Sequence, residues 1–355
     1  MESKIAFYAC MLMVVSCSTP YAEAPWCRPS LVHYGWDIKD TSYLRDHWQE
    51  IDATSPFDGM GIIVTTNPEV WASGKLYTSY QLGWMLFSKE KLRIEQFSAQ
   101  IADLQSTSFA NVTDNLFPVI LAAEYNEGLG WFDDNRWSAA LSNVDVMAQI
   151  MAATSIKNIL MDPEHYAYLM FDYDTQSATY PASREDYYWR VRTIGQRFAS
   201  TIQNRVGPFH ILSLLGYTVA AKNGQYDLLP AFIDGILDVL VLQPGSTFTD
   251  GYEDAYGYKK LNQFVKAADD IHGVAQISGN PGAYAMLVNV GFGLWVDYWG
   301  DTAYFTPTQF GMAAFYAKLL ASRFVWIYSE RMGMMQDDTV NEPYLQVLTH
   351  GSLKF

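Results

Sequence analysis

The chain has 355 residues, of which 50% are hydrophobic and 17% charged, so it has enough apolar material for a large folded core and is not a disordered protein. Its formal net charge of −15 argues against nucleic acid as a ligand, because a phosphate backbone is bound mainly through lysine and arginine. The same charge disfavours heavily sulfated or uronate-rich ligands, whereas a neutral or mildly charged ligand fits it.

The first residues have the pattern of a bacterial export signal. One lysine precedes the apolar stretch from Ile5 to Val15, which is too short to span a membrane as a stable helix. The residues Val14-Val15-Ser16-Cys17 resemble a lipobox, whose cysteine receives a lipid and becomes the mature N-terminus. Ordinary cleavage after Ala24 is the alternative, although Pro25 makes it a poor site. We therefore predict a signal peptide and tether over residues 1–24, lipidated at Cys17, and an extracytoplasmic protein that contacts the membrane only through this anchor, or a secreted one.

Beyond the tether, apolar runs rich in β-branched residues alternate with amphipathic stretches. The runs predict eight strands, over residues 31–37, 60–66, 117–125, 158–164, 210–217, 248–254, 292–298 and 324–330. Residues 239–242 are an alternative to the sixth of them. Helical patterns fall between the strands, over residues 42–51, 91–104, 145–153, 184–205, 228–240, 260–271 and 306–320. Eight strands with intervening helices specify a (β/α)8 TIM barrel, which we predict as a single catalytic domain over residues 25–355.

One connection in this pattern is unusually long. Residues 67–88 follow the second predicted strand and include two tryptophans and two tyrosines. This long loop after strand 2 predicts either one wall of a cleft or an extra helix packed on the barrel.

Acidic residues stand at the ends of most predicted strands. In a TIM barrel these ends meet at one rim, where the chemistry of the fold is located. The strand-end acids are Asp37, Glu124, Asp162, Glu164, Glu253, Asp254, Asp297 and Glu330. Aromatic residues alternate with them, and those predicted to stack on or hydrogen-bond a substrate are Trp36, Trp131, Tyr166, Tyr252, Trp295, Trp326 and Tyr328. Flat rings with polar edges suit sugars, so this rim predicts an oligosaccharide or polysaccharide as the partner.

Asp162 and Glu164 are the most informative of these acids. They stand two residues apart at the end of an apolar run, and such residues point to the same face of a continuous strand. Two like charges on one face tend to keep a proton on one of the carboxyls, whose pKa rises. Hydrolysis of a glycosidic bond needs one carboxylic acid and one carboxylate. We therefore predict Glu164 as the acid/base and Glu253 or Glu330 as its catalytic partner, with Asp297 behind them.

Structural roles compete for several of these acids. Arg323 and Arg331 flank the strand that ends at Glu330, so a salt bridge is the alternative there. Asp133 and Asp134 fit the start of a helix, while the neighbouring Trp131 still borders the predicted cleft.

Other chemistries lack their signatures. The six histidines include no HExxH pair, and neither a phosphate-binding GxxxxGK[ST] or GxGxxG loop nor a GxSxG nucleophile elbow is present. We predict no cofactor and no metal, although an acidic rim leaves room for a carboxylate-bound Ca²⁺ or Mg²⁺.

Five segments together resemble uncharacterised secreted bacterial proteins that are grouped as glycoside hydrolases of TIM-barrel type. The resemblance covers most of the mature chain and implies a proton donor at Glu164, on the fourth strand, with Glu253 or Glu330 as possible partners. The chain departs from the largest clan of barrel glycosidases, since Pro163 precedes Glu164 where asparagine is expected and the seventh strand ends in Asp297 rather than glutamate. The segments are His33-Tyr34-Gly35-Trp36-Asp37, Pro56-Phe57-Asp58-Gly59, Asp162-Pro163-Glu164-His165-Tyr166, Asp250-Gly251-Tyr252-Glu253-Asp254-Ala255-Tyr256 and Val325-Trp326-Ile327-Tyr328-Ser329-Glu330.

These features lead to three hypotheses from different classes. The first is an extracytoplasmic glycoside hydrolase that cleaves a neutral or mildly charged glycan with a carboxylic acid and carboxylate pair. The second is a carbohydrate-binding surface lipoprotein on a TIM-barrel scaffold that has lost catalysis. The third is a structural protein whose rim acids are all occupied by arginines or helix caps.

Overall fold

The computed structural model describes residues 28–66, 70–72, 75–77, 81–123, 128–335 and 341–349. The predicted signal peptide, its lipidated Cys17 and the predicted substrate-binding residue Glu124 lie outside these ranges. Within the ranges, none of the helices combines the length and apolar character that a membrane span requires.

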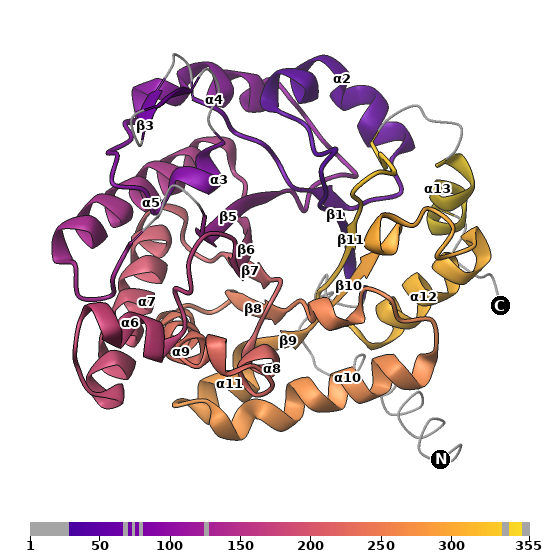
Figure 1. The fold of residues 1–355 in the computed structure, drawn as a ribbon. Coiled ribbons are helices and arrows are strands. Elements are labelled where there is room, and N and C mark those ends of the chain that lie inside the picture. The colour runs from indigo at the N-terminus through magenta and orange to yellow at the C-terminus, as the bar shows by residue number, and fades with distance from the viewer. Residues whose placement is uncertain are drawn as a thin grey trace.

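Two parallel sheets form the centre of a mixed α/β fold (Figure 1). The first has 4 strands in the order β10-β11-β1-β2, and the second has 5 in the order β5-β6-β7-β8-β9. Each predicted strand overlaps one of them, although most observed strands are shorter, β2 shares only Met60 with its prediction, and β9 was not predicted. Their bounds are β1 Ser30–His33, β2 Gly59–Met60, β5 Leu116–Ala122, β6 Asn158–His165, β7 His210–Ser213, β8 Thr247–Asp250, β9 Val288–Val290, β10 Phe292–Trp295 and β11 Phe324–Tyr328.

The two sheets are linked at both of their edges. β9 and β10 are separated only by Gly291, whose N–H donates to the carbonyl of Asp250 at 2.9 Å. At the other edge, Gly61 and Leu116 form an isolated parallel bridge, and the N–H of Ile62 donates to the carbonyl of Leu116 at 3.0 Å. Strand pairing therefore defines two parallel sheets, a coarser result than the single closed barrel expected from the sequence.

Helices cover the outside of the strands (Figure 1). Each predicted helix overlaps an observed one, but α5 begins at Asp134, well before the predicted start at residue 145, and α4 begins at Ser98, after the predicted start at residue 91. Residues 239–240 end α9, so the sixth strand is β8 and not its alternative. Asp133 caps α5 by accepting the N–H of Arg136 at 3.0 Å, as predicted. The helices are α2 Thr41–Thr54, α3 Leu82–Met85, α4 Ser98–Gln105, α5 Asp134–Thr154, α6 Tyr173–Thr179, α7 Arg184–Val206, α8 Tyr217–Ala220, α9 Leu229–Leu240, α10 Leu261–Gly273, α11 Pro281–Leu287, α12 Pro307–Leu320 and α13 Glu342–Thr349.

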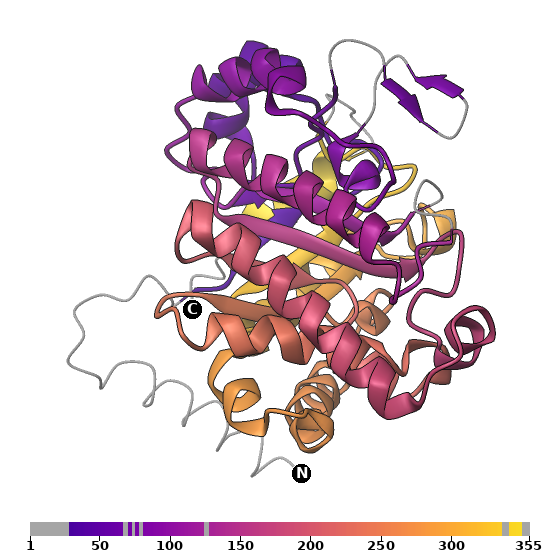
Figure 2. The same ribbon diagram turned by 90° about the vertical axis from the view of Figure 1, so that its left-hand side faces the viewer.

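The long connection after β2 contains both strand and helix. β3 (Val70–Ala72) and β4 (Lys75–Tyr77) pair antiparallel, and Figure 2 shows this ribbon projecting from the body at the upper right. The short helix α3 follows it and buries Leu82 and Met85, so of the two alternatives expected for this segment the extra packed helix is the one observed.

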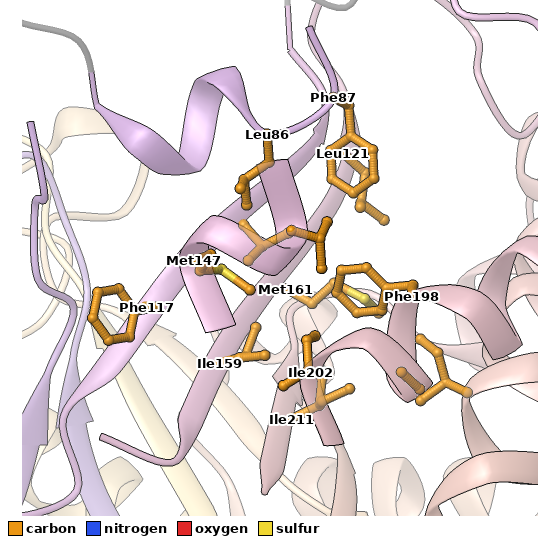
Figure 3. Close-up of a cluster of buried hydrophobic side chains, with 14 of the residues drawn as sticks. Leu86, Phe87, Phe117, Leu121, Met147, Ile159, Met161, Phe198, Ile202 and Ile211 are labelled. Carbon is orange, nitrogen blue, oxygen red and sulfur yellow. The ribbon is translucent and has the colours of Figure 1, made fainter. Parts of the chain in front are cut away.

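Side chains on the two faces of the strands belong to different apolar clusters. Phe117, Ile159, Met161 and Ile211 face the helices, where they pack with Met147, Phe198 and Ile202 (Figure 3). The alternate positions form a second cluster, composed of Val32, Leu116, Leu160, Leu212, Leu214, Phe324 and Trp326. Because this inner cluster takes residues from both sheets, the inner faces of the two sheets pack against each other.

Candidate active site

Asp162 and Glu164 share one face of β6, as the sequence predicts, and contact each other directly. One oxygen of the fully buried Asp162 side chain accepts the backbone N–H of Glu164 at 2.9 Å, and the other accepts the hydroxyl of Tyr166 at 2.8 Å. Burial raises the pKa of Asp162 to about 7, and the charge of Glu164 contributes to the rise. Asp162 is therefore a group that exchanges its proton near neutral pH.

Glu253 enters the same site from the loop after β8, where the short 3₁₀ helix η5 (Glu253–Ala255) begins. The preceding residue, Tyr252, has a φ of 42°, a left-handed conformation that non-glycine residues rarely adopt. Strain of this kind persists where the surrounding structure enforces it, often at functional sites. Here the turn is held by the N–H of Tyr252, which donates to Asp250 at 3.1 Å, and by that of Glu253, which donates to the carbonyl of Leu214 at 3.2 Å.

The electrostatic environment of Glu253 favours its protonated form. Burial raises the pKa of this carboxyl well above its usual value, and the charges of Glu164 and Asp162 raise it further, against a hydrogen bond from Tyr256. Its Oε2 atom is buried and has no hydrogen-bond partner among the described residues. Glu164, Asp162 and Glu253 thus form one coupled group of carboxyls at the ends of β6 and β8.

Tyrosine hydroxyls surround this carboxyl group. For each of them burial is the main reason why the pKa is raised, and the charge of Glu164 adds to it. The five are Tyr34 after β1, Tyr166 after β6, Tyr226 in the 3₁₀ helix η4 (Gly224–Tyr226), Tyr256 after β8 and Tyr328 at the end of β11. All five hydroxyls remain protonated at neutral pH, so they can donate hydrogen bonds to carboxylates or to a ligand.

His165 lies on the opposite face of β6 from the carboxyls. Its ring stacks on Tyr226 with centroids 4.2 Å apart, and its Nε2 atom accepts the N–H of Phe171 at 3.1 Å. Burial lowers the pKa of His165 to about 4, so the ring is neutral and supports the wall of the site.

Glu330 occupies a different position from the one predicted. Its side chain is exposed beyond the end of β11, and its backbone N–H is held by Asp297 at 3.1 Å. Its charge acts on Tyr328, whose pKa rises to about 12, chiefly through burial. Glu253, rather than Glu330, is the acid that the structure couples to Glu164.

Asp297 is buried and organises a loop, a different role from the substrate-binding one that the sequence predicts. Its buried carboxylate accepts the indole N–H of Trp295 at 2.8 Å and the backbone N–H of Met332 at 2.7 Å, besides those of Glu330 and Arg331. A carboxylate with this many donors is fully occupied.

Asp37 is also a structural residue, contrary to expectation. It accepts hydrogen bonds from Ser329 at 3.0 Å and from the N–H of Met335 at 2.8 Å, and it pairs with the buried His33 at 2.7 Å. Burial alone would raise the pKa of Asp37, but His33 and these donors outweigh burial and lower it. Asp37 therefore ties the end of β1 to the segment after β11.

Four more residues predicted to bind substrate have other positions. The rings of Trp131, Trp326 and Tyr252 are buried in the apolar clusters, so they stabilise the fold instead of lining a surface. The Nε1–H of Trp131 donates to the carbonyl of Met170 at 2.7 Å, inside the helical layer. Asp254 is exposed and pairs with Lys222 at 2.6 Å. The burial of the three rings was not predicted, because strand alternation does not reveal how far a ring lies from the end of its strand.

Trp36, Tyr166, Trp295 and Tyr328 remain as accessible or partly accessible aromatics near the carboxyls. Trp36 and Tyr166 are 72% and 48% exposed. Tyr34, Tyr226 and Tyr256 were missed. Tyr34 and Tyr256 belong to strand-end motifs that could have been included, whereas Tyr226 comes from a connecting loop that carries no sequence signal.

Two further observations concern metal binding and cavities. Among the described residues, no group of three or more His, Cys, Asp or Glu side chains is arranged to hold a metal ion. A cavity of about 280 Å³ lies away from the carboxyls, lined by residues such as Leu31, Phe315, Lys318 and Val347, near the start of β1.

No family model matches this chain, and no curated protein matches it significantly.

Proposed function

We propose that the protein is a glycoside hydrolase whose catalytic pair is Glu253 and Glu164. The observation that carries the proposal is the coupling of three carboxyls at the ends of β6 and β8 in one cluster ringed by tyrosine hydroxyls. Cleavage of a glycosidic bond needs a carboxyl that keeps its proton and a second one that is ionised. A shared proton among neighbouring acids meets this requirement.

The raised pKa of Glu253 supports roles that differ from the sequence-based prediction. Glu253 holds its proton because of burial and the nearby charges, so it protonates the oxygen of the leaving sugar. Glu164 then acts as the carboxylate that attacks the anomeric carbon or activates water. Asp162 accepts the hydroxyl of Tyr166 and the N–H of Glu164, and thereby positions Glu164.

The scaffold that we infer for this activity is a single (β/α)8 barrel with a long loop after its second strand. The bridge between Gly61 and Leu116, the continuity of β9 and β10 through Gly291, and the inner cluster shared by both sheets support this closure. In a barrel, the ends of β1, β6, β8 and β11 meet at one rim, where this fold places its active sites.

The proposal retains the extracytoplasmic location, with Cys17 as a lipid anchor on a bacterial membrane. Metabolic labelling with a radioactive fatty acid tests it, since a Cys17→Ala variant that still carries the label would contradict lipidation at this position.

A reducing-sugar screen of the purified protein against plant, algal and microbial glycans tests the activity. Wild type should release reducing ends from at least one neutral glycan, while Glu253→Gln and Glu164→Gln, which keep the size of the side chain, should lose turnover by about 10²- to 10⁴-fold. Equal turnover in all three proteins would refute the assignment. Glycan binding without any release of reducing ends would favour the carbohydrate-binding alternative, which the exposed Trp36 supports.

A further inference from the structure

Trp299 is an exposed aromatic residue that the sequence analysis did not single out. It lies in the 3₁₀ helix η7 (Tyr298–Gly300), directly after the loop residue Asp297, and its ring is 76% exposed. Its φ of 57° and ψ of 29° fall in the left-handed region, which costs an ordinary residue roughly 1–2 kcal/mol. The turn therefore places a large ring in solvent, and burial of the ring offsets little of this energetic cost.

The backbone around Trp299 is held in this conformation from both sides. The N–H of Gly300 donates to the carbonyl of Asp297 at 2.6 Å, and Gly300 itself has a φ of 70°. A side chain at position 300 would meet the guanidinium of Arg331 at 2.8 Å. The loop that presents Trp299 is thus packed against the segment after β11, which Asp297 also holds.

Ring contacts connect Trp299 to the carboxyl cluster. Its ring centroid lies 5.5 Å from that of Trp295, which in turn lies 5.4 Å from that of Tyr256. Tyr256 hydrogen-bonds Glu253, the proposed proton donor. A series of aromatic contacts therefore runs from the reacting carboxyl to an exposed tryptophan.

A second branch of this series ends in Trp36. The ring of Tyr328 lies 5.2 Å from that of Trp295, and the Tyr328 hydroxyl accepts the indole N–H of Trp36 at 2.6 Å. Since this bond uses the only donor of the indole, the exposed part of Trp36 offers a ligand a ring face and no polar group. We call Trp36, Tyr328, Trp295 and Trp299 the aromatic strip.

We propose that Trp299 binds a sugar unit beyond those at the cleaved bond, so that the enzyme prefers oligosaccharides long enough to reach it over disaccharides. The inference rests on the proposed function for the position of the cleaved bond, and it commits to a neutral glycan, because Glu330 is exposed near the strip and would repel an anionic one. Aromatic faces bind the apolar faces of sugar rings, and two exposed indoles at different ends of the strip suit an extended chain.

The test measures binding to a variant that should cleave oligosaccharides only slowly, so its readout is affinity and not turnover. Trp299→Ala and Trp189→Ala are each introduced into the Glu253→Gln variant, which serves as their parent. Each protein is titrated calorimetrically with neutral oligosaccharides of two to six units. Affinity electrophoresis in gels that contain β-glucan, galactomannan, arabinoxylan or starch first identifies a neutral polysaccharide that retards the protein. The oligosaccharide series is then taken from that polysaccharide. Trp189 is the matched control because it is 55% exposed and lies on α7, in the outer helical layer.

Trp299→Ala should weaken binding of the longer oligosaccharides about tenfold, equivalent to about 1.4 kcal/mol, and leave the disaccharide unchanged, while Trp189→Ala has no effect at any length. Equal affinities for Trp299→Ala and its parent at every length would overturn the inference, as would an equal loss for the disaccharide. The absence of any retarding glycan would also overturn it. If wild type cleaves a glycan but Trp299→Ala does not change the affinity at any length, this inference fails and the proposed hydrolysis stands. If affinity depends on length in this way but the protein cleaves no glycan, the proposed hydrolysis fails and this inference stands.

Discussion

The hydroxyl of Tyr328 accepts the indole N–H of Trp36 at 2.6 Å, although 292 residues separate the two in the chain. The contact joins the ends of β1 and β11, which are neighbours in the first sheet. It also sets the angle at which the exposed ring of Trp36 meets solvent.

Replacement of Tyr328 by phenylalanine should therefore affect binding more than folding. The indole loses a partner that water can replace, so the free energy of unfolding should fall by only about 0.5–1.5 kcal/mol in urea titrations. Affinity for a bound glycan should fall more clearly, because the Trp36 ring is no longer oriented. A loss of stability with unchanged affinity would show that the contact serves the fold alone.

The two proposed catalytic roles predict opposite dependence on the leaving group. An aryl glycoside with a very acidic phenol needs no proton, so Glu253→Gln should cleave it nearly as fast as wild type and be slow only on poor leaving groups. Glu164→Gln should be slow on both. Steady-state kinetics over a series of substituted phenols makes the comparison, and a leaving-group dependence for Glu164→Gln instead would return the acid role to Glu164.

Asp162 should control the alkaline limb of the pH profile. Its negative charge helps to raise the pKa of Glu253, so Asp162→Asn should lower that pKa and move the alkaline loss of kcat/KM to lower pH. A profile that keeps its position while its height falls would assign Asp162 a purely structural role.

The same residue links stability to pH. Burial raises the pKa of Asp162 from 3.8 to about 7, so its contribution to stability is fully present below 3.8 and is lost as pH rises to about 7. The rise corresponds to about 4 kcal/mol at most. His165 acts in the opposite direction, since its lowered pKa gives stability above pH 6.5. The difference between wild type and Asp162→Asn isolates the aspartate, and unfolding titrations should find the variant less destabilised at pH 8 than at pH 4.

Asp297 and Asp254 provide a matched pair for stability. Asp297→Ala leaves several buried N–H donors without their acceptor and should cost about 3–5 kcal/mol, while Asp254→Ala breaks an exposed ion pair with Lys222 and should cost less than about 1 kcal/mol. Thermal and urea unfolding of both variants make the comparison. Similar small losses would contradict the loop-organising role of Asp297.

The strain at Trp299 predicts a rank order among substitutions. With a φ of 57°, Trp299→Gly should be more stable than Trp299→Ala by about 1 kcal/mol, the reverse of the order in an ordinary helix or strand. Differential scanning calorimetry measures the two midpoints. An alanine variant at least as stable as the glycine variant would remove the argument from strain.

Strand and helix positions could be predicted because each depends on local periodicity. The apolar run before Asp162 and the alternation that puts Glu164 on its face are properties of a few consecutive residues. The pairing of Glu164 with Glu253 was one of two alternatives, since strand ends alone do not give distances. What separates Glu253 from Glu330 is the left-handed turn at Tyr252, which aims one carboxyl inward, whereas the other stays in solvent.

The errors at the rim have a common physical cause. Asp37 and Asp297 look like ligand-binding acids in sequence, but their donors come from segments far along the chain, Met335 and Met332 among them. A carboxylate whose partners are backbone N–H groups has no signature in the partner sequence, because every residue except proline supplies one. The contact between the edges of the two sheets likewise depends on a bridge at Gly61, outside any regular strand.

The register of β1 with β11, in which Ser30 lies opposite Phe324, also has a consequence for biogenesis. The strand made first must wait for the strand made last, so a nascent or translocating chain carries an uncapped hydrogen-bonding edge for nearly its whole synthesis. A truncation before residue 324 would leave β10 without a paired neighbour and β1 paired only with the short strand β2, and such fragments should aggregate or be degraded instead of accumulating as smaller active domains.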